Sequence, residues 1–210
     1  TTGGFNTAVG YGTLQANTDG VENTAIGVDV LSSNTLGTSN AAVGASSMQE
    51  NTTGYENSAL GYESLFYNTT GIQNTSCGGA SMYFNTTGSK NTGAGYTVMR
   101  YNTTGYENTA MGNIALYNNT TGGQNAAFGY NAGGYNDANT YCTFIGYDAN
   151  QSVTTDFTNS TAIGNGSRIT SSNQIRIGNP FINSIGGFQN WSNISDGRYK
   201  KDVQETVMGL

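Results

Sequence analysis

The chain has 210 residues, of which 31 are Gly, one is Pro and none is His, and only 10% are charged. This composition is unlike that of an average globular domain, but 35% hydrophobic residues are too many for a disordered chain, so the chain is expected to fold. The net charge of −6 excludes a cationic surface for nucleic acid, and the lack of histidine excludes imidazole chemistry. No apolar run is long enough to span a bilayer, so no membrane insertion is predicted.

From the N-terminus onward, the chain repeats itself every 17 residues. The consensus is N-T-T-G-x-x-N-T-A-φ-G-Y-x-x-L-x-x, where φ is apolar, and we number its positions 1 to 17. One glycine series occupies position 11: Gly10, Gly27, Gly44, Gly61, Gly78, Gly95, Gly112, Gly129 and Gly146. A second series occupies position 4: Gly3, Gly20, Gly37, Gly54, Gly71, Gly88, Gly105 and Gly122. A strict period of this length is typical of a solenoid.

Two columns of the repeat are apolar and are predicted to form the core. The φ column, at position 10, contains Val9, Ile26, Val43, Leu60, Cys77, Ala94, Met111, Phe128 and Ile145. The Leu column, at position 15, contains Leu14, Leu31, Met48, Leu65, Met82, Met99 and Leu116.

Seventeen residues are too few for a helix pair, and Asn, Thr, Gly and Tyr are poor helix formers. Each repeat is therefore predicted to be short strands joined by glycine turns, and the fold to be an all-β parallel β-solenoid or β-roll. Each coil should rise about 4.8 Å and pair with its neighbours. The position 7 asparagines are then expected to form an amide ladder: Asn6, Asn23, Asn40, Asn57, Asn74, Asn91, Asn108 and Asn125.

The position 11 glycines are predicted to be structural turn residues, because no phosphate-binding motif contains them. No cofactor or metal site is predicted. Cys77 and Cys142 lie four coils apart, about 19 Å along the axis, and are expected to be free thiols. Two sizeable apolar positions per coil make a thin core, so residues 1–152 are predicted to be the shaft of an elongated homotrimeric fibre.

The repeat resembles the head repeats of trimeric autotransporter adhesins, in which N-[ST]-x-A-[IV]-G coils build a left-handed parallel β-roll. Asn23-Thr24-Ala25-Ile26-Gly27 and Asn108-Thr109-Ala110-Met111-Gly112 show the likeness, which covers about residues 1–150. The coils of this chain are longer than is usual in those heads. The resemblance implies an extracellular fibre.

The regular period ends after Gly146, because the next glycine of the series is Gly164, one residue late. The segment Asn173–Asn179 (N-Q-I-R-I-G-N) alternates like a strand, and Pro180 and Trp191 follow in a stretch that does not repeat. Residues 153–194 are therefore predicted to be a transition or neck segment.

From Ser195 the sequence becomes charged and compatible with a helix, with Ser195 as its N-cap. The string S-D-G-R-Y-K-K-D after N-W-S-N-I resembles the start of the intramolecular chaperone domain of endosialidase-type phage tailspikes. That resemblance implies that residues 195–210 begin a domain that assists trimerisation and then cleaves itself off. Ser195 would be the nucleophile, Lys200 the general base, and Ile194–Ser195 the bond that is cut once.

Together these features predict a structural or adhesive fibre, such as a viral or phage tail fibre, an injection-system fibre or a bacterial surface filament, with no enzymatic turnover. The alternative is a tailspike glycan depolymerase, which would need paired carboxylates. Glu22, Glu56 and Glu107 share position 6 with Gln73 and Lys90, and Lys90–Glu107 is interpreted as a solvated pair.

Two further roles stay open from the sequence alone. Tyr55 and Tyr106 either stack on a surface glycan or receptor, or pack between chains. The N-T-T segments at Asn51, Asn68, Asn85, Asn102 and Asn119, with Asn190 and Asn193, are either glycosylation sequons or simply the turn consensus.

Overall fold

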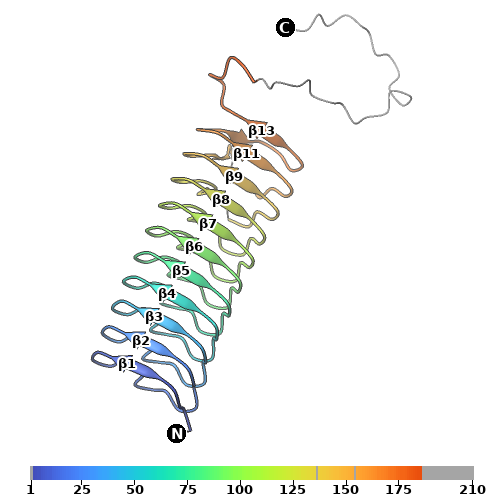
Figure 1. Cartoon of the computed structure of the whole chain (residues 1–210). Coiled ribbons are helices and arrows are strands. Elements are labelled where there is room, and N and C mark those ends of the chain that lie inside the picture. The colour runs from blue at the N-terminus through green and yellow to red at the C-terminus, as the bar shows by residue number, and fades with distance from the viewer. Residues whose placement is uncertain (1, 136, 154, 186–210) are drawn as a thin grey trace, which may run out of the picture. The chain divides into compact units, whose positions relative to one another are not determined.

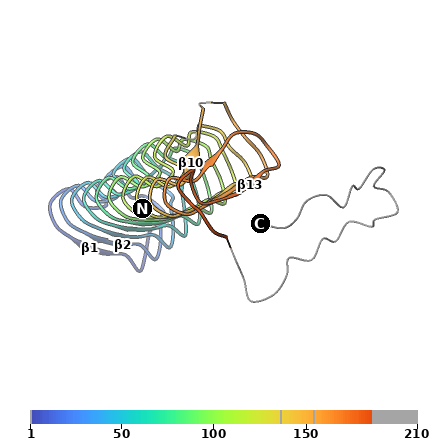
Figure 2. The ribbon, with the colours of Figure 1, turned by 90° about the horizontal axis from the view of Figure 1, so that it is seen from above.

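The computed structural model describes residues 2–135, 137–153 and 155–185. The unit that ends at Pro180 is a parallel β-solenoid with one coil about every 17 residues, so the predicted all-β parallel β-solenoid is confirmed. Its coils follow one another along the axis in chain order (Figure 1), and seen from above they overlap, each coil offset from the one before (Figure 2).

One strand of each coil contributes to a single sheet of eleven parallel strands. The strands are β1 (Thr7–Val9), β2 (Thr24–Ile26), β3 (Ala41–Val43), β4 (Ser58–Leu60), β5 (Thr75–Cys77), β6 (Thr92–Ala94), β7 (Thr109–Met111), β8 (Ala126–Phe128), β9 (Thr143–Ile145), β11 (Thr161–Ile163) and β13 (Ile175–Ile177). Two shorter strands, β10 (Asn150–Gln151) and β12 (Arg168–Ile169), form a second parallel pair.

The register repeats the sequence period without a slip from β1 to β9, so like residues lie over like. Across the one-residue insertion Ile163 still pairs with Ile145, because the extra residue is absorbed in the loop before β11. The coils also bond to one another outside the strands. The Leu65 amide donates to the Ser81 carbonyl at 3.0 Å, and the Thr69 amide donates to the Thr86 carbonyl at 3.0 Å.

The Leu column is buried as predicted, with Leu31, Met48, Leu65, Met82, Met99 and Leu116 fully inside. The prediction for the φ column is wrong. Most of its side chains point outward, and Leu60 is 54% exposed and Met111 48% exposed. The inward strand residue is the alanine at position 9, as in Ala25 and Ala110, which are fully buried. Successive side chains of a strand alternate between its faces, so a buried position 9 forces position 10 outward.

Position 14 supplies the third core column, with residues such as Val30 and Val98. Where one column departs from the consensus, a neighbour compensates. In one coil the large Phe144 takes the place of the small residue at position 9. In the coil before it, Gly133 takes the place of the Leu at position 15 and leaves room for the Phe144 ring, since a Cβ on Gly133 would lie 2.8 Å from that ring. The interior is therefore packed by shape, as in protein cores generally.

Three positions of the coil adopt the left-handed backbone region, at positions 6, 13 and 15. The Leu column is one of them, with φ of +54° at Leu65 and +49° at Met82. A non-glycine residue in this region costs on the order of 1 kcal/mol or more. The burial of the same side chains offsets that cost, because a fully buried Leu or Met contributes roughly 1.5–3 kcal/mol.

The predicted helical start at 195–210 lies outside the described residues, and the boundaries proposed at 152 and 194 stay predictions. The sheet itself continues past residue 152, through β11 and β13. Within the described ranges every regular element is a strand, and no helix there could cross a membrane.

Candidate functional surfaces

The interior of the solenoid contains two asparagine ladders. The first is the predicted one at position 7, and it is confirmed. The Asn57 side-chain amide donates to Asn40 Oδ1 at 3.1 Å and to the Gly71 carbonyl at 2.8 Å, while the Asn57 backbone amide donates to the same Asn40 oxygen at 3.0 Å. The ladder stops where Cys142 occupies position 7, although the Cys142 backbone amide still donates to Asn125 Oδ1.

The second ladder is made by the position 1 asparagines, most of which begin the N-T-T segments, and it was not predicted from the sequence. The Asn68 amide donates to Asn51 Oδ1 at 2.9 Å and to the Gly71 carbonyl at 3.0 Å. The same pattern recurs at Asn34, Asn51, Asn85, Asn102 and Asn119, all fully buried. These amide nitrogens are inside the folded chain and hydrogen-bonded, which favours the structural interpretation over glycosylation. Asn190 and Asn193 lie outside the described residues.

The position 11 glycines end the strands at φ values between +125° and +143°. A Cβ on any of them would lie 1.9–2.9 Å from the backbone of the glycine in the next coil. No larger residue fits there, because both the backbone conformation and the close approach exclude a side chain. Their geometry is that of a turn.

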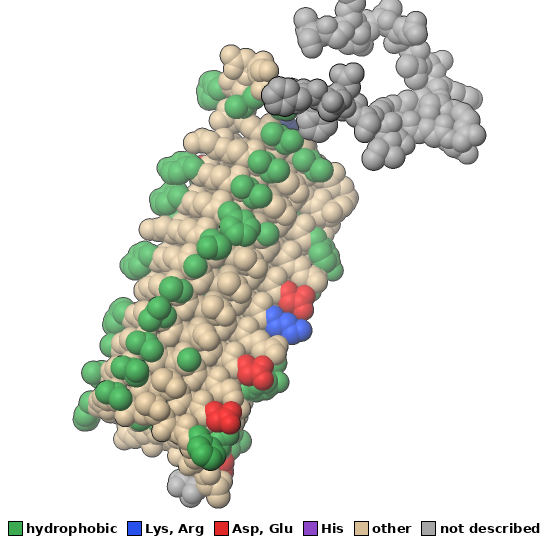
Figure 3. Space-filling view, viewed as in Figure 1, with side chains coloured by type: hydrophobic (Ala, Val, Ile, Leu, Met, Phe, Trp, Pro, Cys, Tyr) green, Lys and Arg blue, Asp and Glu red, His purple; other side chains and the backbone are tan. Residues whose placement is uncertain are grey.

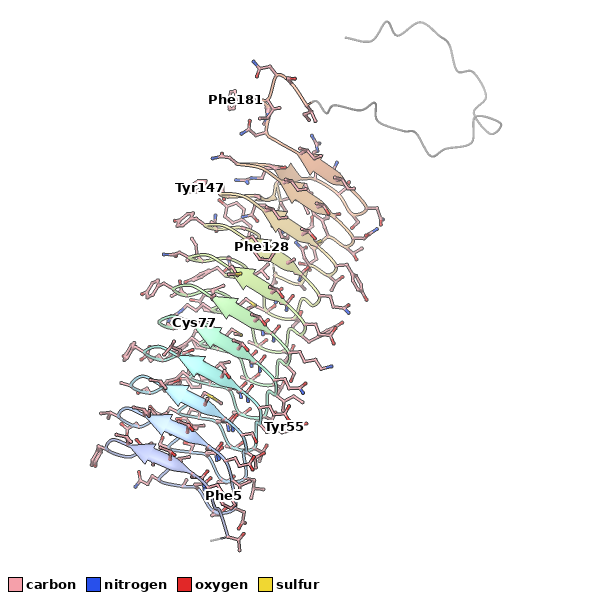
Figure 4. The ribbon with its side chains drawn as sticks, in the orientation of Figure 1. Phe5, Tyr55, Cys77, Phe128, Tyr147 and Phe181 are labelled. Atoms are coloured by element: carbon pink, nitrogen blue, oxygen red, sulfur yellow. The ribbon has the colours of Figure 1, made fainter. Side chains whose placement is uncertain are left out.

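The outward φ column forms a continuous apolar row on the strand face, which we call the outer stripe: Val9, Ile26, Val43, Leu60, Cys77, Ala94, Met111, Phe128, Ile145, Ile163 and Ile177. Figure 3 shows this row running along the solenoid, and Figure 4 labels two of its members, Cys77 and Phe128. Strands β1 to β11 contain no charged residue. An exposed apolar band without charges is typical of a contact surface.

Tyrosines at position 12 border the outer stripe just beyond the glycine turns. Tyr62, Tyr96 and Tyr147 are each about three-fifths exposed, and the rings of Tyr130 and Tyr147 stack with centroids 5.1 Å apart. Figure 4 shows Tyr147 at this edge and Tyr55 at the opposite edge. The other outward position of the strands, position 8, is mostly Thr, so the outer stripe is bordered by hydroxyl groups on one side and, in several coils, by tyrosine rings on the other.

The two cysteines differ in environment, and both are free as predicted. Cys77 is exposed within the outer stripe, whereas Cys142 is buried among core residues. Burial raises the pKa of the Cys142 thiol, so it stays protonated and unreactive near neutral pH.

Position 6 carries the charged row seen at one edge in Figure 3. Lys90 Nζ lies 3.4 Å from Glu107 Oε1, and both side chains are well exposed, so the predicted solvated pair is confirmed. Gln73 donates to Glu56 at 2.8 Å, and Gln124 donates to Glu107 at 2.9 Å. Exposed pairs of this kind contribute about 0–1 kcal/mol each. These carboxylates are therefore engaged by neighbours in their own row.

A cluster of aromatic side chains occupies positions 16 and 17 in the middle coils, and the sequence analysis overlooked it. We call it the aromatic patch: Phe66, Tyr67, Tyr83, Phe84, Tyr101 and Tyr117. Tyr67, Phe84 and Tyr101 form an offset stack along the axis, with centroids 5.6 and 5.3 Å apart and planes within 10° of parallel. The Arg100 guanidinium lies over the Tyr83 ring, 4.7 Å from its centroid. A change from polar to aromatic residues in successive coils is the signal that reveals the patch.

Two open grooves of about 410 and 430 Å³ run beside the patch and share Tyr101 and Thr120. The first is lined by the stacked rings and by a row of threonines, Thr86, Thr103 and Thr120. The second continues past Asn118 to Tyr135 and Asp137. No residue of either groove belongs to a strand, so the grooves and the outer stripe are separate surfaces.

The predicted cleavage residues Ser195 and Lys200 lie outside the described residues. In the described part of the chain, no cluster of three or more acidic or cysteine side chains is arranged to hold a metal ion. Comparison with protein-family models, with curated proteins and with solved structures found no match to this chain.

Proposed function

We propose that the chain is the shaft of a homotrimeric extracellular fibre, on a virion, a phage tail or a cell surface, whose role is structural and adhesive. The observation that carries the proposal is the outer stripe. It runs along eleven successive strands and is apolar, uncharged and uncovered in the single chain. Water-exposed apolar surface of this extent is stabilised by burial against another surface.

The dimensions of the strand face agree with a stable contact between copies. Eleven strands at about 4.8 Å span roughly 50 Å, and a three-residue strand is about 10 Å long. A standard interface takes about 800 Å² from each partner, so a band about 16 Å wide is sufficient. The strands with their bordering position 12 tyrosines supply that width. Because the stripe is regular along the axis, copies can pack in parallel with equal coils at equal heights.

The C-terminal resemblance supports the same assignment. A chaperone domain of the endosialidase type, of which residues 195–210 resemble the beginning, would align three chains before the shaft folds. In this proposal Lys200 takes the Ser195 hydroxyl proton, Ser195 Oγ forms an ester with the Ile194 carbonyl carbon as the Ile194–Ser195 C–N bond breaks, and the departing Ser195 amine receives that proton. Water then hydrolyses the ester, once per chain, and no other reaction is assigned. The resemblance of residues 1–150 to adhesin heads adds a second, independent indication of a fibre.

The test uses sedimentation equilibrium and the natural Cys77. We expect a mass three times the 21.9 kDa of one chain, and we expect mild oxidation to link Cys77 of one copy to Cys77 of another, since equal coils meet along the stripe. With Cys77→Ser as background, Leu60→Cys should restore the link. The matched control, Thr53→Cys, is exposed at the N-T-T corner of the same coil, outside the strands and their border, and should not. A folded monomer without Cys77 linkage would disprove the assembly.

A further inference from the structure

The aromatic patch departs from the repeat consensus, and the fold does not require this departure. At position 17 the first coils carry Ala16, Ser33 and Glu50, whereas the middle coils carry Tyr67, Phe84 and Tyr101. Backbone pairing is the same on both sides of this change: the Glu50 amide bonds to the next coil at 3.0 Å, and so does the Tyr67 amide. The rings therefore add a surface to a scaffold that is already complete without them.

The groove next to the rings presents hydrogen-bond acceptors. Each threonine hydroxyl donates to the carbonyl of the next coil, at 3.0 Å for Thr86 and 2.9 Å for Thr103, so its proton is used internally. The oxygen lone pairs remain for a donor from outside. The Asn118 side-chain amide likewise donates to the Gly134 carbonyl at 2.8 Å. The Asp137 carboxylate accepts a hydrogen bond from the Thr120 hydroxyl at 2.6 Å. A ligand with several hydroxyl donors matches this row.

The charges near the groove favour an uncharged ligand. Two cations lie near the grooves among the described residues, and both are engaged: the Arg100 guanidinium lies over the Tyr83 and Phe84 rings, and the Arg168 guanidinium lies over the Tyr135 ring and pairs with Asp148. Asp137, at the far end, would repel an anion. Partial burial, together with the Glu63 charge, raises the pKa of Tyr83, so this phenol stays neutral near neutral pH.

We infer that the grooves along the aromatic patch bind a neutral glycan chain. The apolar C–H face of successive sugars would lie on the offset-stacked rings, and the hydroxyl groups would donate to the threonine, Asn118 and Asp137 oxygens. Rings and threonines recur at the rise of one coil, about 4.8 Å, which is close to the advance of an extended glycan chain by one pyranose unit. This inference rests on the proposed attachment role of the fibre and not on its oligomeric state.

The experiment adds hexasaccharides to the whole 210-residue chain and records saturation-transfer NMR and calorimetric titration. The probes are neutral hexamers of glucose in α and β linkage, of mannose and of N-acetylglucosamine, and one acidic hexamer of galacturonate. At least one neutral hexamer should bind, and Tyr101→Ser should weaken that binding by about tenfold or more, because a central aromatic contact is lost. The substitution is compatible with the fold, since Ser33 occupies the same position of another coil.

Tyr96→Ala is the matched control, because Tyr96 is an exposed tyrosine of the same coil at position 12 and lines neither groove. It should leave binding unchanged. The inference is overturned if no neutral hexamer binds, if the galacturonate hexamer binds more tightly, or if the two variants weaken binding equally. It is also overturned if Tyr101→Ser lowers the sedimentation mass, because the groove would then be a contact between copies. If the wild-type chain were a monomer and still bound the glycan, the proposed trimer would be wrong but the glycan inference would stand.

Discussion

Asn57 shows how a single residue type supports the stack. Its side chain bonds to Asn40 on one side and to Gly71 and Asn74 on the other, and it is fully buried. Every buried side-chain nitrogen or oxygen in the described residues has a hydrogen-bond partner. Buried amides are stable only when they are paired, because an unpaired buried polar group costs about 1–3 kcal/mol. The repetition of Asn at positions 1 and 7 is therefore a requirement of the interior.

Replacing Asn57 by Ala should destabilise the folded chain by about 2–4 kcal/mol, since the buried Asn74 backbone amide loses its acceptor and the Gly71 carbonyl loses one of its two side-chain donors. Denaturant unfolding would measure the change in the free energy of unfolding. Asn113→Ala is the control, because Asn113 is exposed, and it should change that free energy by less than about 0.5 kcal/mol. Equal effects of the two substitutions would argue against the ladder.

At the scale of the coil, the sequence predicted the period, the strands, the position 7 ladder and the Leu column, but it placed the φ column on the wrong side. Alternation from the buried Asn at position 7 puts position 9 inside and position 10 outside, so the information was present. What obscured it is that the outward residue is larger and more apolar than the inward Ala. Hydrophobicity alone assigns such a residue to the core of its own chain, whereas here it lies on the outer face of the sheet.

Two neighbouring residues of β7 test this orientation with the same new side chain. Ala110→Leu should destabilise the fold by about 1–3 kcal/mol, because it adds volume to a packed interior. Met111→Leu should have almost no effect, because its side chain is outward and Leu60 fills the equivalent position of β4. Thermal unfolding of both variants gives the comparison. If Ala110→Leu left the transition unchanged, the inward position of the Ala column would be wrong.

For the unit as a whole, stability is shared between adjacent coils. Each coil bonds to the one before and the one after it along the strands, along the Leu side and along the N-T-T corner. A stack of this kind behaves as a sum of coils and of contacts between neighbours. The aromatic patch was harder to predict, because it becomes visible only when the coils are aligned in space. The second ladder was harder to predict, because its N-T-T sequence is also that of an ordinary turn.

Deleting residues 85–101 removes one coil and joins Phe84 to Asn102, which restores every column of the repeat. Thermal unfolding of this deletion, beside the sixteen-residue deletion of 85–100, tests the in-register stack most directly. We predict a cooperative transition for the whole-coil deletion, only slightly below that of the intact chain. The shorter deletion should unfold at a clearly lower temperature, because its one extra residue either shifts the later residues to the wrong side or has to be absorbed in a loop, as happens before β11. The in-register stack would be contradicted if the chain lost its fold after the whole-coil deletion but kept it after the sixteen-residue deletion.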